Sequence, residues 1–355
     1  MKVAIDATPL SLSSGGLARY TQELSLALAE TFPEDTYLLV SDQPFLPPPG
    51  APANLRCLPG PRSAWERRWW LWGLDRSLER NGAELFHGTH FEAPLLARRP
   101  AVVTVHDLSP WMDASWQPGA SRVQRRAPLV LGLRLAVRFI TPTEAIRKQV
   151  IERFRIPAAE VVAVPLAPAS CFRPVRALRN GKPYFLLVAT LEPRKNLDTV
   201  LGAWRHLRRL FDVEFRIAGR RRSDGPALAG ESGLRWLGEV SDEELAGLYS
   251  GAAALLYPSL YEGFGLPVLE AMRCGTPVIA SRIPAIVEVA GEAAVLVDPR
   301  DVRAWVEAMQ AVLTQPEWGA ELRRRGFARA AQFSWQRTAT LTREVYEEAH
   351  RRFYA

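Results

Sequence analysis

The stretch ALLYPSLYEGFGLPVLEAMRCGTPVIA, residues 254–280, contains a strand, a helix and a second strand in the order that parallel sheets require. Residues 254–257 are a short aliphatic run, and residues 258–265 form a turn that contains Gly-Phe-Gly. A helix is expected from residue 266, because proline is favoured in its first turn. Residues 277–280 have the composition of the next strand, so this stretch predicts a β-α-β unit.

The same alternation extends through the whole chain and predicts an α/β fold with helices on both faces of parallel sheets. In the first half, we expect strands at residues 3–5, 37–40, 84–86, 102–106, 139–141 and 161–164. In the second half, we expect strands at residues 184–189, 214–218, 234–237, 254–257, 277–280 and 295–297. The sequence therefore predicts two doubly wound, Rossmann-like domains that face each other across a cleft.

The length of the chain agrees with two domains. Its 355 residues exceed the roughly 250 to 300 at which a single core stops growing. We expect domains at residues 1–165 and 184–335, a proline-rich linker at 166–183, and a C-terminal helix at 336–355 that packs back on the first domain.

Composition narrows the functional class. The three cysteines are widely spaced and form no C-x-x-C pair, so neither a disulfide framework nor a zinc site is expected. There is no run of eighteen apolar residues, and the first ten residues have a strand pattern, so we expect a cytoplasmic protein. The net charge of +7 fits an anionic small molecule or membrane surface, whereas no nucleic-acid-binding module accompanies it. Only four of the 45 basic residues are lysine, which draws attention to Lys195.

Two glutamates flank the predicted helix start in residues 261–280. Glu262 lies on the loop before the helix and Glu270 near the end of its first turn. Backbone N–H groups beside Gly263 and Gly265 can approach a phosphate closely, which leaves the carboxylates free to accept hydrogen bonds from sugar hydroxyls. Acidic residues are also favoured at any helix N-terminus, whether or not a ligand binds there.

A second motif, ATLEPRKNLDTVL at residues 189–201, places two cations at the start of a helix that we expect from about Asn196. Arg194 and Lys195 suit a polyanion such as a diphosphate, and they oppose the helix dipole when no anion is bound. A solvated pair of basic residues on a loop is the alternative.

Weaker signals occur in the first domain. Gly15 and Gly16 follow the first strand and precede a helix, but they lack the full G-x-G-x-x-G pattern. His106 ends a buried strand, where α/β folds place functional side chains, and we expect it to contact substrate. His87 and His90 lie nearby, but no carboxylate has ligand spacing, so no metal site is expected.

A further segment near residues 65–80 is rich in tryptophan and arginine. Trp65, Trp69 and Trp72 share one face if the segment is helical. We expect this face to pack against the core, because apolar helical stripes usually do and Leu71, Leu74 and Leu78 flank this one. Peripheral contact with the anionic inner face of a membrane is the alternative.

Together these motifs resemble the retaining glycosyltransferases of family 4, also called glycosyltransferase group 1, which have the GT-B fold. The resemblance spans nearly the whole chain and is most specific at residues 261–281, where two glutamates are separated by seven residues. It implies that Glu262 addresses the donor sugar and Glu270 the nucleotide ribose. It also implies that Lys195 binds the diphosphate and that His106 lies near the transferred sugar.

The resemblance assigns other donor contacts as well. Gly15 and Gly16 match a phosphate-contacting loop. Thr190 stands where the family commonly has arginine, and the subgroup with a similar LEPRKN run implies that Arg194 supplies that charge. Backbone groups for sugar and phosphate are expected from Gly263, Phe264, Gly265 and Leu266.

The implied activity is a metal-independent, retaining transfer of a hexosyl unit from a nucleoside diphosphate sugar of the GDP or UDP type to a hydroxyl of a glycan or lipid-linked acceptor. Mannosyl transfer from GDP-mannose in polysaccharide biosynthesis is the best match. The sequence has no D-x-D motif, and no cofactor is expected. The alternatives are a degenerate nucleotide-sugar-binding or scaffold protein and a nucleotide-sugar epimerase of the same fold.

Overall fold

In the computed structural model, the described residues are 1–12, 15–96, 98–113, 115–116, 122–133, 135–175, 181–222 and 230–355. The chain divides into two compact units. Unit 1 comprises Met1–Met112, Gln117–Leu166 and Ser334–Ala355, and unit 2 comprises Asp113–Trp116 and Ala167–Phe333. The sequence predicted that the first domain ends at residue 165 and that the second ends at residue 335. Residues 176–180, which belong to the predicted linker, lie outside the described residues.

Unit 1 is built on one parallel sheet in the order β3-β2-β1-β4-β5-β6-β7. Its strands are β1 Lys2–Asp6, β2 Thr36–Val40, β3 Leu55–Cys57, β4 Leu85–Gly88, β5 Ala101–Thr104, β6 Arg138–Thr141 and β7 Val161–Ala163. Its α-helices are α1 Gly16–Thr31, α2 Leu74–Arg80, α3 Arg122–Gly132, α4 Glu144–Phe154 and α11 Trp335–Tyr354.

Unit 2 repeats the architecture with a parallel sheet in the order β10-β9-β8-β11-β12-β13. Its strands are β8 Tyr184–Val188, β9 Glu214–Ala218, β10 Leu234–Gly238, β11 Ala254–Tyr257, β12 Val278–Ser281 and β13 Val295–Val297. Its α-helices are α5 Leu197–Leu207, α6 Asp242–Gly251, α7 Leu266–Arg273, α8 Pro284–Ala290, α9 Val302–Thr314 and α10 Pro316–Ala330.

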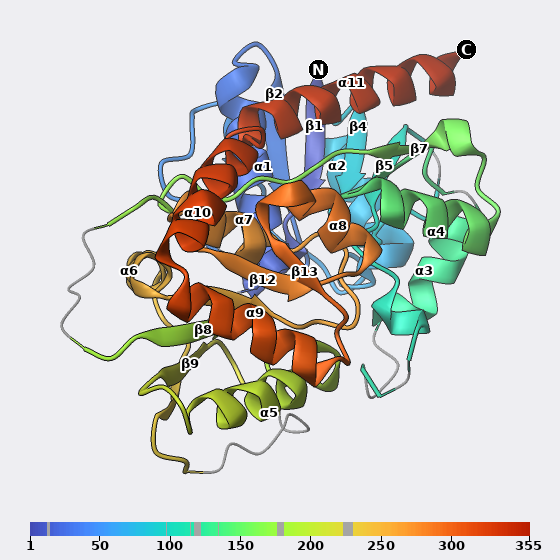
Figure 1. Ribbon diagram of the computed structural model, residues 1–355. Coiled ribbons are helices and arrows are strands. Elements are labelled where there is room, and N and C mark those ends of the chain that lie inside the picture. The colour runs from blue at the N-terminus through green and yellow to red at the C-terminus, as the bar shows by residue number, and fades with distance from the viewer. Residues whose placement is uncertain are drawn as a thin grey trace. The chain divides into compact units, whose positions relative to one another are not determined.

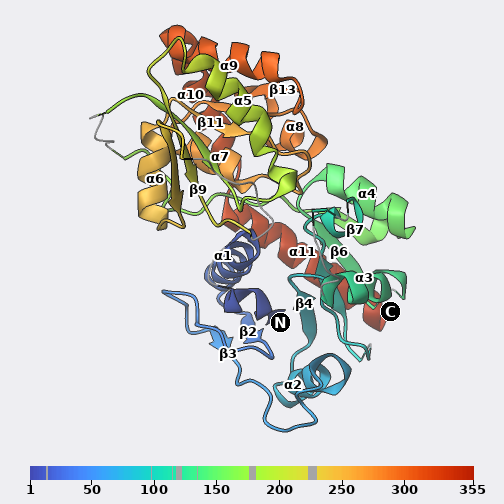
Figure 2. The same ribbon diagram turned by 90° about the horizontal axis from the view of Figure 1, so that it is seen from below.

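The central strands are rich in apolar residues, as in β8 (YFLLV) and β11 (ALLY), because helices cover both faces of each sheet. In unit 2, α5 and α9 pack together on one face (Figure 2), where Trp204 and Trp305 are fully buried. On the other face, α7 packs against α6 and α10 (Figure 1). These layers confirm the predicted α/β fold class.

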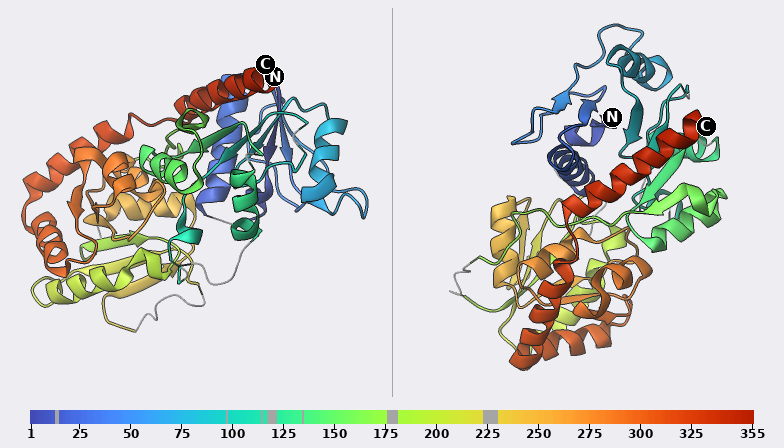
Figure 3. Two further views of the ribbon diagram at one scale, coloured as in Figure 1. Left: turned by 90° about the vertical axis from the view of Figure 1, so that its right-hand side faces the viewer. Right: turned by 90° about the horizontal axis from the view of Figure 1, so that it is seen from above.

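The last helix, α11, belongs to unit 1 although it follows unit 2 in sequence. It packs along α1 and against β5 and β6, and Figure 3 shows α11 beside α1. The hydroxyl of Tyr346 lies 2.7 Å from Nδ1 of His87, which is at the end of β4. The expectation that the C-terminal helix crosses back to the first domain is therefore confirmed.

Some local predictions were wrong. The short edge strand β3 was not predicted, because its sequence Leu-Arg-Cys contains no β-branched residue, unlike the valine-rich three-residue strands β7 and β13. The strand predicted at 102–106 ends at Thr104, which places His106 on the following loop. The helix expected at 65–80 is a turn, a π-helix at Trp69–Gly73 and then α2.

The core position expected for the tryptophan stripe was also only partly right. Trp69, Leu74 and Leu78 are buried, whereas Trp65 is 69% exposed and Trp72 is 53% exposed. The change of helix type explains this result, because residues at α-helical spacing no longer share one face when the segment is not one continuous α-helix.

Candidate functional site

The sheet order of unit 2 brings two distant loops together. β8 and β11 are neighbouring strands, but the chain leaves β8 toward β9 and β10 and leaves β11 toward β12 and β13. Loops diverge at such a switch point, and doubly wound folds bind their ligands there, outside the carboxyl ends of the strands. The loop after β8 carries Arg194 and Lys195, and the loop after β11 carries Glu262.

The Glu262 carboxylate contacts both cations directly. Nζ of Lys195 lies 2.5 Å from Oε1 of Glu262, and Nη1 of Arg194 lies 3.1 Å from Oε2. Arg194 also donates a hydrogen bond of 2.8 Å to the carbonyl of Tyr261. The sequence did not predict that Glu262 pairs with both cations; that its carboxylate also accepts from a sugar hydroxyl stays a prediction, since each oxygen has a further lone pair.

A second carboxylate completes the cluster. Oε1 of Glu192 lies 2.7 Å from Nη2 of Arg194, and Oε2 of Glu192 lies 2.7 Å from Nη1 of Arg222. The chain thus supplies its own anions beside the two cations that precede α5. Counting the side chains named here, all from the described part of the chain, three formal positive charges and two formal negative charges leave one positive charge in excess, which suits a polyanionic ligand.

The neighbouring cations determine the protonation state of the Glu262 carboxylate. Burial alone would raise the pKa of Glu262, but Lys195 and Arg194 outweigh it and lower the value to about 2. Burial, together with Arg194, lowers the pKa of Lys195, although Glu262 partly offsets both effects. Glu262 is consequently ionised at neutral pH.

Asn196 holds the loop that carries Arg194 and Lys195 in place through hydrogen bonds. Its side-chain amide donates to the carbonyl of Pro258 at 3.0 Å and to the carbonyl of Pro299 at 2.6 Å. These carbonyls follow β11 and β13, so one side chain ties together three loops at the same edge of the sheet. Asn196 has a left-handed backbone (φ 52°), which asparagine tolerates better than most residues.

The N-terminus of α7 lies on the same loop as Glu262. Gly265 precedes the helix with φ of +103°, and a Cβ atom there would lie 2.5 Å from Cδ1 of Ile286. Only glycine adopts this conformation without strain. The loop therefore presents the first N–H groups of α7, which carry partial positive charge, beside the cation cluster.

Glu270 lies within α7 and is buried. The hydroxyl of Tyr249, in α6, donates to its Oε2 at 3.0 Å. Burial and the neighbouring Glu270 carboxylate raise the pKa of Tyr249, which keeps this hydroxyl protonated as a donor. The sequence predicted the position of Glu270 but not this partner.

The other predicted site residues have simpler surroundings. Thr190 is partly buried two residues after β8, in unit 2, whereas His106, Gly15 and Gly16 belong to unit 1. Gly15 has φ of 116° at the start of α1, a conformation that requires glycine. Gly16 is exposed, and a Cβ atom there would meet nothing within 4 Å.

His106 is held in one tautomer. Its Nε2 lies 2.8 Å from the carbonyl oxygen of Thr89, which can only accept, so Nε2 carries the proton. Its ring packs edge-on against Tyr20, with centroids 4.6 Å apart. Burial lowers the pKa of His106, so the ring is neutral at pH 7 and Nδ1 is an acceptor.

His87 has a structural environment. Its two ring nitrogens lie 2.7 Å from the Tyr346 hydroxyl and 2.8 Å from the Thr104 hydroxyl. Within the described ranges, no group of three or more His, Cys, Asp or Glu side chains is arranged to hold a metal ion.

Comparison with known proteins decides the family. Residues 171–331 match the family described as glycosyl transferases group 1, and residues 14–167 match glycosyltransferase family 4. The O-antigen chain mannosyltransferase B of Escherichia coli is 33% identical over 286 residues, which cover 74% of each chain. The chain belongs to the family 4 glycosyltransferases.

Solved structures share the GT-B fold of this family 4 glycosyltransferase. Sucrose-phosphate synthase from Thermosynechococcus elongatus superposes with a TM-score of 0.74 at 20% identity, covering 98% of both chains. Anabaena HepE in complex with UDP and glucose superposes with a TM-score of 0.73 at 16% identity, covering 98% of this chain and all of that one. At these identities the likeness concerns the fold alone.

Sequence reasoning missed several members of the glycosyltransferase's cation cluster. Glu192 lies inside the motif already singled out, two residues before Arg194, and that spacing was the available signal. Arg222 belongs to a run of three arginines that looks like composition bias. Tyr257, whose ring lies 5.7 Å from Nζ of Lys195, looked only like the last residue of a strand.

Proposed function

We propose that this glycosyltransferase transfers a mannosyl unit from GDP-mannose to a hydroxyl group of a glycan or lipid-linked acceptor, with retention of anomeric configuration and without a metal ion. The observation that carries the proposal is the surplus positive charge of Arg194, Lys195 and Arg222 at the switch point of unit 2. The mannosyl group is favoured by the O-antigen chain mannosyltransferase B among its relatives.

The chemical requirement explains why cations matter. The bond between the anomeric carbon and the diphosphate oxygen breaks, so negative charge grows on the leaving diphosphate while a new bond forms to the acceptor oxygen. The acceptor proton passes to the departing phosphate. Cations and helix N–H groups fixed in place before the reaction stabilise this charge without reorganisation. Arg194, Lys195 and the N-terminus of α7 would do so here.

Glu262 has two tasks in this proposal. It holds Arg194 and Lys195 together, and it is ionised at neutral pH, so it can accept a hydrogen bond from a sugar hydroxyl in exchange for one of its present contacts. Glu270 would accept from the nucleotide ribose, oriented by Tyr249.

Two other functions use the same residues differently. A degenerate binding or scaffold protein would bind a nucleoside diphosphate without transfer, and an epimerase would change the nucleotide sugar without an acceptor. The buried ion pairs of Glu262 favour an enzyme over a scaffold, because a protein that does no chemistry has little need of a costly buried charge cluster. The mannosyltransferase among the relatives favours transfer over epimerisation.

The first experiment is a thermal-shift panel of GDP, UDP, dTDP and ADP, each with magnesium and with EDTA, on wild type and Glu270→Ala. A ligand that binds the native state raises its apparent stability, so a shift with one diphosphate identifies the base. We expect a shift with GDP in both buffers and its loss in Glu270→Ala. Glu307→Ala, an exposed change on α9, should keep the shift.

Transfer is then measured with the diphosphate sugar of the base identified. The anomeric proton of the product, followed by NMR, reports whether configuration is retained. Binding without transfer to any acceptor would favour the scaffold, and conversion of the donor sugar alone would favour the epimerase. No shift with any nucleotide would reject the donor site.

The exposed tryptophans support a further part of the proposal, contact with the anionic inner surface of a membrane. Trp65, Leu71 and Trp72 are exposed, and the Arg68 guanidinium lies over the Trp65 ring at 5.4 Å. Tryptophan and arginine together suit the interface between lipid headgroups and acyl chains. Among the described residues, no helix is both long enough and apolar enough to cross a bilayer.

Sedimentation with vesicles tests this contact. We expect binding to vesicles that contain phosphatidylglycerol, no binding to pure phosphatidylcholine, and loss of binding in the double variant Trp65→Ser, Trp72→Ser. Unchanged binding by that variant would reject the tryptophan surface. Leu210→Ser, which removes an exposed leucine from unit 2, is the control.

A further inference from the structure

Unit 1 has a switch point of its own, and a pocket lies there. The chain leaves β1 toward β2 and β3 on one side, while β4 and the strands after it lie on the other. Asp6 ends β1, Asp42 follows β2 by two residues and Glu92 follows β4 by four. All three line one pocket, as expected for a ligand site at the carboxyl ends of parallel strands.

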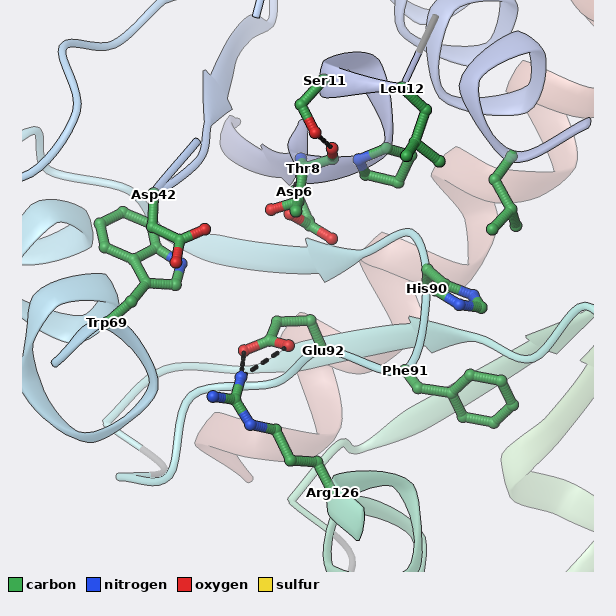
Figure 4. A pocket seen from close by; sticks show the side chains of 12 residues that line it. Asp6, Thr8, Ser11, Leu12, Asp42, Trp69, His90, Phe91, Glu92 and Arg126 are labelled. Atoms are coloured by element: carbon green, nitrogen blue, oxygen red, sulfur yellow. Dashed lines mark hydrogen bonds and ion pairs between the residues drawn. The ribbon is translucent and has the colours of Figure 1, made fainter. Parts of the chain in front are cut away.

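Carboxylates dominate the polar part of this pocket. Figure 4 shows the side chains of Asp6, Asp42 and Glu92 turned toward the same space. Arg126 lies 3.2 Å from Oε1 of Glu92, and among the described lining residues it is the one arginine or lysine. The described lining therefore has more formal negative than positive charge.

The carboxylates are close enough to oppose one another's ionisation. Burial and the nearby Asp42 raise the pKa of Asp6 to about 6, although hydrogen bonds from Thr8 lower it. Burial and the nearby Asp6 raise the pKa of Glu92 to about 8, although Arg126 lowers it. A pocket that disfavours the charge of its own carboxylates also disfavours an anionic ligand.

The rest of the lining is apolar or neutral. Trp69 and Phe91 are buried and line the pocket together with Pro9 and Leu17. His90 also lines it, and within the part of the chain that the structure describes its buried Nδ1 has no hydrogen-bond partner. Burial lowers the pKa of His90 to about 4, so the ring is neutral at pH 7 and leaves one polar atom for a ligand.

We propose that this pocket binds an uncharged sugar ring of the acceptor and excludes phosphate. A sugar ring has hydroxyl donors on its rim and apolar C–H faces, which match carboxylate acceptors and an aromatic wall respectively. A phosphate has only acceptor oxygens and negative charge at neutral pH, so it would meet carboxylates without enough cations to offset them.

The inference rests on the proposed function, because it names the chemical class of that function's acceptor. It assigns the sugar end of a glycan or glycolipid to unit 1, and it requires that any phosphate of a lipid carrier lies outside this pocket. The carboxylates that recognise the acceptor are separate from Glu262 and Glu270, which lie in unit 2.

Binding without transfer is the direct test. Saturation-transfer difference NMR of the full chain compares methyl α-mannoside, methyl α-glucoside and methyl α-galactoside with mannose 6-phosphate, in the absence of nucleotide. We expect saturation of at least one methyl glycoside, none of mannose 6-phosphate, and loss of the signal in Asp42→Asn and Trp69→Phe. Glu30→Gln removes a carboxylate from an exposed position of α1 and should keep the signal.

Kinetics provide the second readout. With the glycoside that binds, Asp42→Asn should raise KM by about tenfold or more, because a site built for hydroxyls loses an acceptor. The thermal shift caused by GDP should be unchanged in this variant, which also establishes that it is folded. Glu92→Ala, which removes the carboxyl group that pairs with Arg126 and lines the pocket, should raise KM in the same way.

Two results would overturn the inference: saturation of mannose 6-phosphate equal to or greater than that of every methyl glycoside, or normal glycoside binding and KM in both carboxylate variants. The failure of the proposed function looks different. In that case no nucleotide shifts the thermal transition or no sugar is transferred, while glycoside binding in unit 1 persists and still depends on Asp42.

Discussion

Nζ of Lys195 lies 2.5 Å from Oε1 of Glu262, although 67 positions separate the two residues in the sequence. The contact exists because β8 and β11, which precede these residues, are neighbours in the sheet of unit 2. Both side chains are about nine-tenths buried, so each charge depends on the other and on Arg194.

This dependence predicts that replacing Lys195 costs more stability than replacing Lys182. Lys195→Ala should destabilise unit 2 by about 2–4 kcal/mol, because removing one partner of a buried ion pair leaves the other undercompensated. Lys182→Ala breaks an ion pair of 2.8 Å with Asp212, but both side chains are exposed and the expected cost is below about 1 kcal/mol. Thermal unfolding of both variants by calorimetry measures the difference, and equal costs would contradict the buried-pair interpretation.

Replacing Glu262, the partner of Lys195, should affect GDP binding and sugar transfer differently. Glu262→Gln removes a negative charge beside Arg194 and Lys195, so affinity for GDP should be unchanged or higher. Transfer should fall by about 100-fold or more, because the variant loses a charged acceptor for the sugar. Calorimetric titration with GDP and a transfer assay provide the two quantities. A parallel loss of both would indicate that Glu262 acts only by keeping the loop folded, and Glu307→Gln is the exposed control.

The backbone of the α7 loop predicts a contrast between two glycines. Gly265→Ala should destabilise unit 2 by about 1–3 kcal/mol, because φ of +103° strains any residue with a Cβ atom. Gly247→Ala lies inside α6, where a Cβ atom meets nothing within 4 Å, and should stabilise by about 0.5–1 kcal/mol. Thermal unfolding and GDP affinity of both variants check this contrast. A neutral Gly265→Ala would show that the loop does not need its left-handed residue.

The buried histidine of unit 1 predicts loss of stability in acid. Burial lowers the pKa of His87 to about 3 from an ordinary value of 6.5, so the unfolded chain binds this proton first as the pH falls. The contribution of the neutral His87 ring to the free energy of unfolding is complete above pH 6.5 and declines toward pH 3. It should be smaller by about 2 kcal/mol at pH 5, since each pH unit between the two values corresponds to about 1.4 kcal/mol.

Melting temperatures between pH 7 and pH 5 test the prediction. His87→Gln should be less stable at pH 7 and show a shallower decline than wild type, while His206→Gln, exposed on α5, should decline like wild type. Asp6, whose pKa is raised, acts in the opposite direction in this range and is unchanged in both variants. An equally steep decline in His87→Gln would assign the acid sensitivity to other groups.

The sequence was sufficient for the α/β class because burial on both faces of a sheet leaves a direct trace, a continuous apolar run such as the one at residues 184–188. It was also sufficient for the position of Gly265, Pro267 and the helix that follows, because these preferences come from local backbone geometry. Segments without a strong local preference were less predictable. The three-residue strand β3 and the helix change at Trp69–Gly73 are examples.

What the sequence by itself determined is therefore the local character of each segment and the residue types at the loop ends, Lys195 and Glu262 among them. Only the tertiary structure decided which of them meet. Strand order puts Lys195 against Glu262, and the return of α11 puts Tyr346 against His87, 259 positions apart. Strand order also places Asp6, Asp42 and Glu92 around one pocket. The physical reason is that burial, pairing and pKa depend on neighbours in space, which the order of residues along one chain does not specify.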